Sequence, residues 1–324
     1  MRPSEIAAGR RERLVVICPV YNEEAVIPLF FARLQPVIQA IADRYETHVL
    51  FLNNASSDGS LDAIRRLREL HPDVYYLTLS KNCGYQRSVE CGLRNAQGDL
   101  FVVIDVDCED PPEMIPRFLE ELRNGADIVY GERRDRPEGP FLKGMRKLFY
   151  RVTRAVADED IILDMAEFAM ITREVRDAIN VDTSSFPFIR ASIGRVGFRR
   201  VGIPYRREHR IAGRTHYNFV GMTIFAIAGI LSSSTLLLRL PAYLFPFWAA
   251  AMVALGFAYV AEGTRATLAG LLVGVALYVG ITCMAVSIYV ARVYKNTLGR
   301  PNFILDSRNC AFQPRHAPVR VGAG

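Results

Sequence analysis

Short apolar runs alternate with longer stretches of helical apolar spacing through the first two hundred residues. The predicted strands cover residues 14–20, 48–52, 74–79, 102–105, 127–132 and 198–205, and the predicted helices cover about 24–43, 61–70, 85–95 and 112–124. Strands that alternate with helices of ten or more residues favour a mainly parallel sheet with helices on both faces. The pattern therefore predicts an α/β domain.

Three of these strands run directly into polar loops, at residues 21–23, 53–58 and 105–109. In parallel sheets, ligands bind at the carboxyl ends of the strands, so these loops are expected to converge on one site. No Gly-x-Gly-x-x-Gly follows the first strand. Its absence argues against a dinucleotide-dependent dehydrogenase.

The most informative loop is acidic and ends in two prolines. After the apolar run 102–104 come Asp105, Asp107 and Glu109 at alternate positions. In extended backbone, the carboxylates of Asp105 and Asp107 would point to one side, roughly 6–7 Å apart at Cα. Oxygen ligands of this kind suit Mg²⁺ or Mn²⁺ bridging to a substrate's phosphates. A second interpretation, compatible with the first, makes Asp110 the N-cap of the following helix.

Charge almost disappears between residues 218 and 291. The uncharged runs 241–261 and 267–291 are each long enough to span about 30 Å as a helix. Residues 218–238 are also uncharged, so three spans are an alternative. Two spans keep the catalytic domain on the same side as the basic tail, as the positive-inside rule prefers. We therefore expect interfacial helices at 218–240.

The sequence thus predicts four parts. They are a cytosolic catalytic domain at 1–217, interfacial helices at 218–240, a transmembrane hairpin at 241–291 and a basic cytosolic tail at 292–324. The tail has six basic residues against one acidic residue, which accounts for most of the formal charge of +6. This placement favours contact with anionic lipid over nucleic acid. Both termini are expected to face the cytoplasm, because two spans leave the catalytic domain and the basic tail on one side. Residues 1–13 lack an apolar core and are not expected to be a signal peptide.

Two basic stretches are candidates for binding anions. Residues 141–157 read as a basic amphipathic helix, which either is a solvated face or docks on lipid headgroups. Arg206, Arg207 and Arg210 precede the apolar region and are well placed to hold a phosphate. The six cysteines show no Cys-x-x-Cys pairing and are expected to be reduced thiols.

Five short motifs carry a resemblance to one enzyme family. They are Pro19-Val20-Tyr21-Asn22-Glu23, the polar stretch 53–60, the acidic stretch 105–113, Arg210-x-x-Gly213-x-Thr215-x-Tyr217, and Gly299-Arg300-Pro301. Over about residues 14–305 the chain resembles glycosyltransferase family 2, and within it the polyprenyl-phosphate glycosyltransferases related to dolichol-phosphate mannose synthase. The resemblance implies a GT-A fold, a Rossmann-like and mainly parallel mixed sheet, followed by interfacial helices and a two-helix transmembrane hairpin.

The resemblance also implies roles for individual residues. The nucleotide sugar would contact Pro19, Tyr21, Glu23, Asn53, Asn54, Asp58, Lys81 and Asp105. Asp105, Asp107 and Glu109 would hold Mg²⁺ or Mn²⁺. The acceptor phosphate would meet Arg206, Arg207, Arg210 and Thr215. The catalytic set would be Asp105, Asp107, Asp164, Glu167 and Arg210.

Three departures from the family pattern bear on specificity. Asn53-Asn54 stands where the family usually has Asp-Asp, and Glu109 replaces a common Gln. Ala166-Glu167-Phe168-Ala169 stands where relatives usually have Gly-Asp-Phe-Arg. Asparagine keeps a donor and an acceptor but loses the charge, so donor preference is expected to change. The missing arginine removes one expected phosphate contact.

The implied reaction moves a sugar from a nucleotide diphosphate sugar to a polyprenyl phosphate at a membrane, with inversion. A phosphate acceptor is itself a nucleophile and needs little general-base help. Asp164 and Glu167 would orient the donor, or act as base for an alcohol acceptor, or be ordinary surface acids before a strand. Rival functions are the same fold acting on another lipid or saccharide, and a non-catalytic nucleotide-sugar-binding scaffold. Homo-oligomers are possible, and no nucleic-acid partner is expected.

Overall fold

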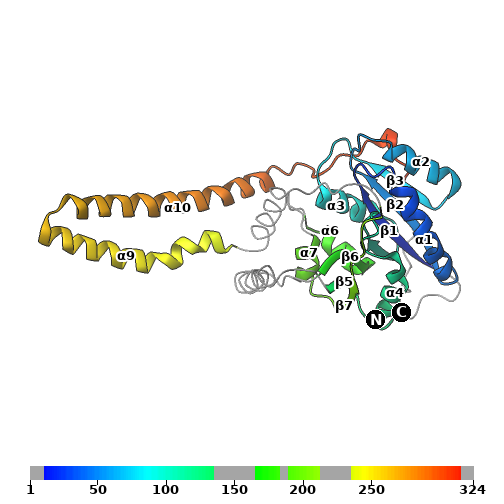
Figure 1. Cartoon of the computed structure of the whole chain (residues 1–324), viewed down its shortest axis with the longest axis horizontal. Helices are drawn as coiled ribbons and strands as arrows, with labels where there is room; N and C mark the ends of the chain where they lie inside the picture. The colour runs from blue at the N-terminus through cyan, green and yellow to red at the C-terminus, as the bar shows by residue number, and fades with distance from the viewer. Residues whose placement is uncertain (1–10, 135–164, 183–188, 212–234, 315–324) are drawn as a thin grey trace, which may run out of the picture. The chain divides into compact units, whose positions relative to one another are not determined.

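The computed structural model describes residues 11–134, 165–182, 189–211 and 235–314. These residues fall into two units, each of which is described by itself (Figure 1). The first unit contains the sheet, its helices and residues 301–314. The second contains two long helices between residues 236 and 297.

The first unit is built on a seven-stranded mixed sheet with the order β3-β2-β1-β4-β6-β5-β7. The strands are β1 Glu12–Val20, β2 Tyr45–Asn53, β3 Val74–Thr78, β4 Leu100–Val103, β5 Ile128–Arg134, β6 Met165–Thr172 and β7 Arg200–Arg206. Strand β6 pairs antiparallel with both β4 and β5, whereas the other strand pairs are parallel. The predicted mainly parallel sheet is confirmed.

Helices cover both faces of this sheet (Figure 1). They are α1 Ile27–Ile41, α2 Ser60–Leu70, α3 Tyr85–Asn95, the short 3₁₀ turn η2 Pro112–Met114, α4 Ile115–Arg123, α6 Arg173–Asn180 and α7 Ile189–Arg195. Alternate residues of β1 enter different cores: Val16 packs with Phe30 of α1, and Ile17 packs with Leu93 of α3. Burial on both faces explains why the central strands are continuous apolar runs.

Strand β6 was not predicted, and its presence corrects one interpretation. Glu167 lies within β6 rather than on a surface segment before a strand. Its side chain is only 12% exposed and forms an ion pair of 2.8 Å with Arg190 of α7. The interpretation of Glu167 as an ordinary surface acid is therefore wrong.

Residues 301–314 pack against β3, the strand at one edge of the sheet. Two antiparallel bridges join Tyr76 to Ala311 and Leu79 to Leu305. The amide of Ser80 also donates to the carbonyl of Ile304 at 2.9 Å. This segment, assigned from the sequence to a basic tail, covers backbone groups that an open edge strand would leave unpaired.

The second unit is an antiparallel pair of helices, α9 Leu236–Glu262 and α10 Arg265–Thr297. Trp248 stacks on Tyr278 with ring centroids 4.4 Å apart and donates to the carbonyl of Gly274 at 3.1 Å. Gly263 ends α9 in the left-handed region at φ 63°, where glycine has no steric penalty. This residue makes the tight turn between the helices possible.

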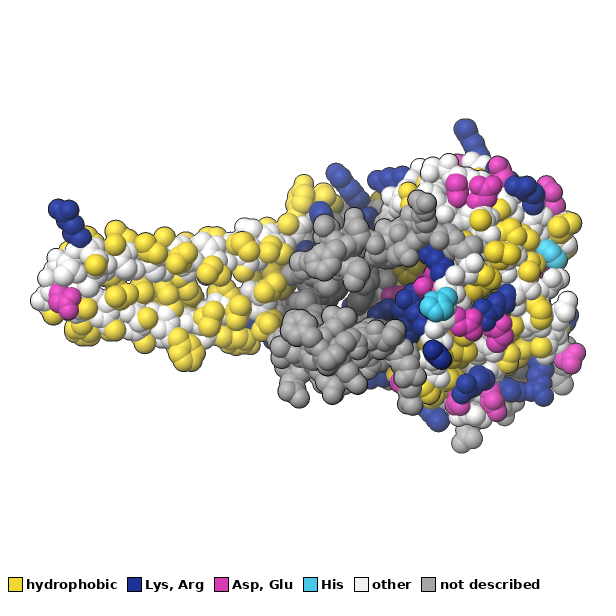
Figure 2. Space-filling model, in the orientation of Figure 1, with side chains coloured by type: hydrophobic (Ala, Val, Ile, Leu, Met, Phe, Trp, Pro, Cys, Tyr) yellow, Lys and Arg dark blue, Asp and Glu magenta, His cyan; other side chains and the backbone are white. Residues whose placement is uncertain are grey.

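Both helices are long and apolar enough to cross a membrane. Apolar side chains cover most of their visible surface (Figure 2). Helix α9 begins at Leu236 and α10 ends at Thr297, so each extends beyond the uncharged runs 241–261 and 267–291. The interfacial helices were predicted over 218–240, but residues 236–240 form the first part of α9, so the prediction is wrong for them. Residues 218–234 and the predicted basic helix over 141–157 lie outside the described residues.

Candidate functional site

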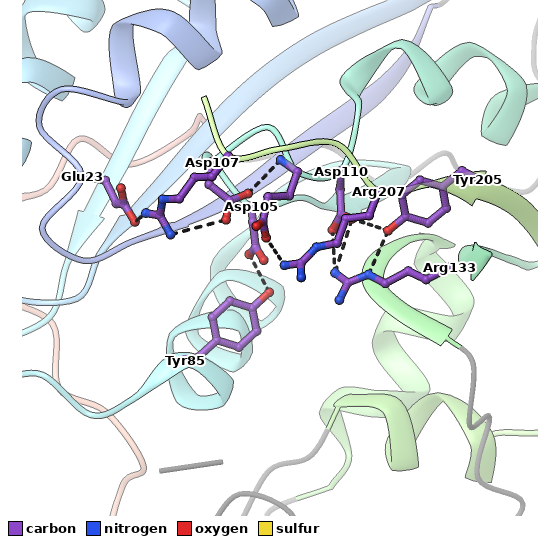
Figure 3. Close-up of polar contacts among 10 residues, drawn as sticks. Glu23, Tyr85, Asp105, Asp107, Asp110, Arg133, Tyr205 and Arg207 are labelled. Atoms are coloured by element: carbon purple, nitrogen blue, oxygen red, sulfur yellow. Dashed lines mark hydrogen bonds and ion pairs between the residues drawn. The ribbon is translucent and has the colours of Figure 1, made fainter. Parts of the chain in front are cut away.

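The acidic motif begins where β4 ends, and its backbone turns there. Val106 and Asp107 form a turn, and Cys108 has φ 59°, in the left-handed region. The extended backbone expected between Asp105 and Asp107 is therefore not observed. The two carboxylates take different partners (Figure 3).

Asp105 faces the first turn of α3. Its Oδ1 accepts a hydrogen bond of 2.8 Å from the hydroxyl of Tyr85. Burial, together with the negative charges of Asp107 and Asp110, raises the pKa of Asp105 to about 7. Tyr85 is a site residue that the sequence analysis missed, because no motif marks a residue 20 positions away from Asp105.

Asp107 faces the end of β7 and the residues that follow it. Arg210 lies 3.6 Å from Asp107, measured from Nη1 to Oδ2, and its Nη2 donates to Glu23. Burial raises the pKa of Asp107, although Arg210 and Arg207 oppose the shift. Arg210 thus links the loop after β1 to the acidic motif (Figure 3).

The segment 206–211, called the arginine segment below, runs beside the acidic motif. The amide of Glu208 donates to the carbonyl of Glu109 at 2.9 Å, and the amide of Ile211 donates to the carbonyl of Asp107 at 3.1 Å. The side chain of Arg207 forms an ion pair with Glu109. Arg206, at the end of β7, is exposed. Arg207 and Arg210 therefore reach the acidic motif as a pair.

One arginine on α1 anchors this segment. Arg33 donates two hydrogen bonds to Glu113, at 2.7 and 2.9 Å, and two to Glu208, at 2.8 and 3.1 Å. Arg33 was not predicted as a site residue. Its helical position between apolar neighbours gives it no motif, and its partners lie 80 and 175 residues away.

Asp110 is the most buried carboxylate of the acidic stretch, with 1% exposure. Its side chain pairs with Arg133 at 3.2 Å and accepts a hydrogen bond from the hydroxyl of Tyr205. The following 3₁₀ turn has Pro111 at its N-cap, without a side-chain cap. The predicted helix-capping role of Asp110 is therefore wrong. This residue instead ties the acidic motif to β5 and β7.

Asn53 and Asn54 use their amides inside the protein. Asn53 is 1% exposed and its Oδ1 accepts from the amide of Ser56 at 3.0 Å. Asn54 is 4% exposed, accepts from the amide of Cys83 at 3.0 Å and donates to Oδ1 of Asn82 at 3.1 Å. The contacts of Asn54 link the loop after β2 to the loop after β3, whereas Asn53 stabilises its own loop.

Asp58 also serves the local fold, since its Oδ1 accepts from the amide of Ser60 at 3.0 Å at the start of α2. Pro19 is buried within β1, at the carboxyl end of the strand. Tyr21, with 37% exposure, and Lys81 present exposed side chains from neighbouring loops. Asp164 and Thr215 lie outside the described residues.

The donor chemistry of Asp105, Asp107 and Glu109 fits a hard cation such as Mg²⁺ or Mn²⁺. Among the described residues, however, no three His, Cys, Asp or Glu side chains converge closely enough to hold a metal ion by themselves. A metal held here would need further oxygen ligands from water or from a substrate. A nucleoside diphosphate supplies such ligands.

Two solved structures can be compared with this chain. A mannosyltransferase from Pyrobaculum calidifontis, solved with GDP-Man and Mn²⁺, has 21% identity, a TM-score of 0.40, and coverage of 89% of this chain and 88% of its own. Glucosyl-3-phosphoglycerate synthase from Mycobacterium tuberculosis, solved with UDP, has 20% identity, a TM-score of 0.44, and coverage of 69% and 80%.

Closer relatives appear among protein sequences. The glycosyltransferase YkcC of Bacillus subtilis is 32% identical over 92% of this chain and 94% of its own length. The bactoprenol glucosyl transferase of Shigella phage SfX is 28% identical over 91% and 99%. The prophage bactoprenol glucosyl transferase homolog of Escherichia coli is 28% identical over 90% and 98%.

The family model described as glycosyl transferase family 2 matches residues 15–180, which include most of β1 and all of β2 to β6. Together with the mixed, mainly parallel sheet and the two long apolar helices, this match confirms the GT-A fold class predicted from the sequence. It also confirms that the protein is a glycosyltransferase rather than a dehydrogenase. The chain belongs to glycosyltransferase family 2.

Proposed function

We propose that this glycosyltransferase moves a sugar, with inversion, from a nucleotide diphosphate sugar to the phosphate of a polyprenyl phosphate. The observation that carries the proposal is the contact between the acidic motif and the arginine segment. Asp107 pairs with Arg210, and the nearby Glu109 pairs with Arg207. Such a place can receive two phosphate-bearing substrates, and the names of the bactoprenol relatives support the acceptor class.

The arginines act on the acceptor in this proposal. Guanidinium groups bind phosphate oxygens in bidentate geometry. Arg207 and Arg210 both lie in the arginine segment, which Arg33 holds through its hydrogen bonds to Glu208. An acceptor phosphate held there attacks the anomeric carbon of the sugar directly, so a general base is unnecessary. Glu167, paired with Arg190 and hydrogen bonded by Gln86 at 3.3 Å, is held in place beside α3 to orient the donor sugar.

The donor diphosphate belongs on the acidic side of the same site. Asp105, Asp107 and Glu109 would hold the divalent cation, and that cation would neutralise charge on the leaving nucleoside diphosphate. The hydroxyl of Tyr85 orients Asp105 through its hydrogen bond to Oδ1. Tyr21 and Lys81 offer exposed side chains for base or phosphate contacts, while Asn54 fixes the loop that carries Lys81.

The helix pair would place this chemistry at a membrane. Helices α9 and α10 have the length and composition of a transmembrane hairpin, which lets the polyprenyl chain of the acceptor stay in lipid. In our proposal the catalytic unit and both termini face the cytoplasm. A reporter enzyme fused after residue 324 tests this orientation: activity in the cytoplasm supports two spans, and activity outside supports three.

The reaction itself is tested with the full chain purified in detergent. Undecaprenyl phosphate and undecaprenol are compared as acceptors, with UDP-linked and GDP-linked sugars and with Mg²⁺ or Mn²⁺. We expect a lipid-linked sugar phosphate, identified by mass spectrometry, only with the phosphorylated lipid. Transfer to undecaprenol or to another lipid would favour a different acceptor. Absence of transfer with any donor, from folded protein, would favour a non-catalytic scaffold.

A further inference from the structure

The carboxylates that would hold a metal already have cationic partners. Arg210 pairs with Asp107 and Glu23, and Arg207 pairs with Glu109 (Figure 3). The side chains of Asp107 and Glu23 are only 14% and 12% exposed. Two guanidinium groups therefore supply positive charge where a divalent cation would supply it.

A metal ion that entered alone would have to break these pairs. Separating the two Arg210 pairs leaves largely buried charges uncompensated, which is unfavourable unless new partners are available. The aqueous cation also loses part of its own hydration shell. A metal ion alone brings no anion with which the released side chains of Arg207 and Arg210 could pair. The carboxylates are thus poor metal ligands while both arginines remain on them.

A nucleoside diphosphate changes this balance, because its phosphate oxygens can accept hydrogen bonds from the guanidinium groups. We propose that the site accepts its divalent cation only as a complex with a nucleoside diphosphate, with Arg207 and Arg210 serving as exchangeable counter-cations until that complex arrives. The proposed function supplies the identity of this ligand, and the inference rests on it to that extent.

The backbone of the arginine segment favours an exchange by side-chain rotation. Glu208 and Ile211 donate main-chain hydrogen bonds to the carbonyls of Glu109 and Asp107. Arg33 holds the side chain of Glu208 from α1. These contacts do not depend on Arg207 or Arg210, so the segment can stay in place while its arginine side chains turn from carboxylate to phosphate.

Mn²⁺ binding to the full chain in detergent tests the proposal without any sugar transfer. The electron paramagnetic resonance signal of free Mn²⁺ is measured with protein alone, with protein plus UDP and with protein plus GDP. Nucleotide without protein corrects for Mn²⁺ bound to nucleotide alone. We expect protein alone to retain at least tenfold less Mn²⁺ than protein with one of the nucleotides. Equal retention with and without nucleotide, or no retention in any mixture, would overturn the proposal.

A charge-matched pair of variants tests the role of the arginines. R207Q/R210Q removes both counter-cations, and we expect it to retain Mn²⁺ without nucleotide, with affinity raised about tenfold or more. R117Q/R123Q, which removes the same number of positive charges at two exposed positions of α4, should behave as the wild type. Unchanged Mn²⁺ retention by a folded R207Q/R210Q protein would contradict the inference. A wild-type protein that needs nucleotide for Mn²⁺ yet transfers no sugar would refute the proposed function alone.

Discussion

The hydroxyl of Tyr85 donates a hydrogen bond of 2.8 Å to Oδ1 of Asp105. This contact joins the first turn of α3 to the second residue after β4. Asp105 has no ion pair within the described part of the chain, so Tyr85 is the side chain that fixes its direction. A hydrogen bond to a carboxylate also favours the charged form, which a metal ligand requires.

Replacement of Tyr85 by Phe removes the donor and keeps the ring. We expect kcat/KM to fall about tenfold, the effect of losing one hydrogen bond to a charged group. The apparent affinity for Mn²⁺ in the presence of nucleotide should fall as well, because Asp105 loses the group that orients it. Steady-state kinetics over a range of Mn²⁺ concentrations measures both effects.

Tyr45→Phe is the control for that variant, since Tyr45 is a buried tyrosine at the start of β2, far along the strand from the site. It should leave both quantities within about twofold of the wild type. If Tyr85→Phe and Tyr45→Phe gave the same kinetics, Tyr85 would be a packing residue only.

The Asp110–Arg133 pair predicts a large effect on stability. Asp110→Asn leaves the guanidinium of Arg133, whose side chain is 16% exposed, without its carboxylate partner. We expect a loss of about 3 kcal/mol in the free energy of unfolding, because breaking a buried pair leaves one charge uncompensated. Chemical unfolding followed by far-ultraviolet circular dichroism measures this free energy of unfolding.

A double-mutant cycle separates the pair from its surroundings. Asp110→Asn combined with Arg133→Met should cost less than the sum of the two single changes. Asp62→Asn, at an exposed acidic position of α2, provides the control and should change stability by under about 0.5 kcal/mol. Additive single effects would show that Asp110 and Arg133 do not interact.

His48 predicts a dependence of stability on pH. Burial lowers the pKa of His48, with Arg13 acting in the same direction and Glu46 opposing it. Its Nε2 lies 3.0 Å from Glu46 and its Nδ1 lies 3.0 Å from the amide nitrogen of Gln313, which fits the neutral ring with its proton on Nε2. In the unfolded chain, His48 takes up a proton near its ordinary pKa of about 6.5.

Below that pH the unfolded state binds more protons than the folded state at this position. Stability should therefore fall as the pH drops through about 6.5 toward 5.5, and recover above it. The midpoint of thermal unfolding is measured at several pH values for the wild type and for His48→Gln. The variant should lose less stability on acidification. Identical pH dependence in both proteins would show that His48 does not contribute.

The segment 301–314 packs against the edge strand β3, so a substitution in this segment should change the stability of the protein. The amide of Ala311 donates to the carbonyl of Tyr76 in β3 at 2.8 Å. Ala311→Pro removes this donor and should destabilise the protein by about 1–3 kcal/mol. Phe312→Ser, at the adjacent and half-exposed side chain, should have little effect. A wild-type unfolding midpoint for Ala311→Pro would show that the segment is not a structural part of the sheet.

The sequence alone was sufficient to predict the helices and strands that show a clear local pattern of apolar residues. The buried run 14–20 and the helical spacing of Ile27, Phe30 and Leu34 correspond to β1 and α1, because periodicity reports directly which face is buried. The two long helices were equally visible as uncharged runs. Motif resemblance also located the acidic and arginine-rich stretches that the fold brings together.

Contacts between distant residues could not be predicted in the same way. Arg33 and Glu208 are 175 positions apart, and nothing in the pattern of α1 marks Arg33 as an anchor. The turn at Asp107 was missed because alternate acidic residues were read as extended backbone, whereas Cys108 adopts φ 59°. Strand β6 was missed because the chain gives no hairpin turn signal for a strand that pairs with β4 and β5.

Asn53 and Asn54 have contacts within the protein that their motif did not predict. Asn53 is the last residue of β2 and Asn54 follows it, and their side chains form hydrogen bonds with Ser56 and Asn82, respectively. Asparagine can donate to Oδ1 of Asn82, which an ionised aspartate cannot do. The amide of Asn54 thus supports the loop after β3 through a hydrogen bond that an aspartate would not form.

The central claim is tested most directly by nucleoside diphosphate release from the purified full chain. Release is measured with and without undecaprenyl phosphate, and with Mn²⁺ or with a chelator, for the wild type and for Asp105→Asn/Asp107→Asn. We predict release from the wild type that requires both the lipid phosphate and the metal, and at least a hundredfold less from the variant. Equal release of nucleoside diphosphate by both proteins, or release that does not depend on undecaprenyl phosphate, would contradict the proposed reaction.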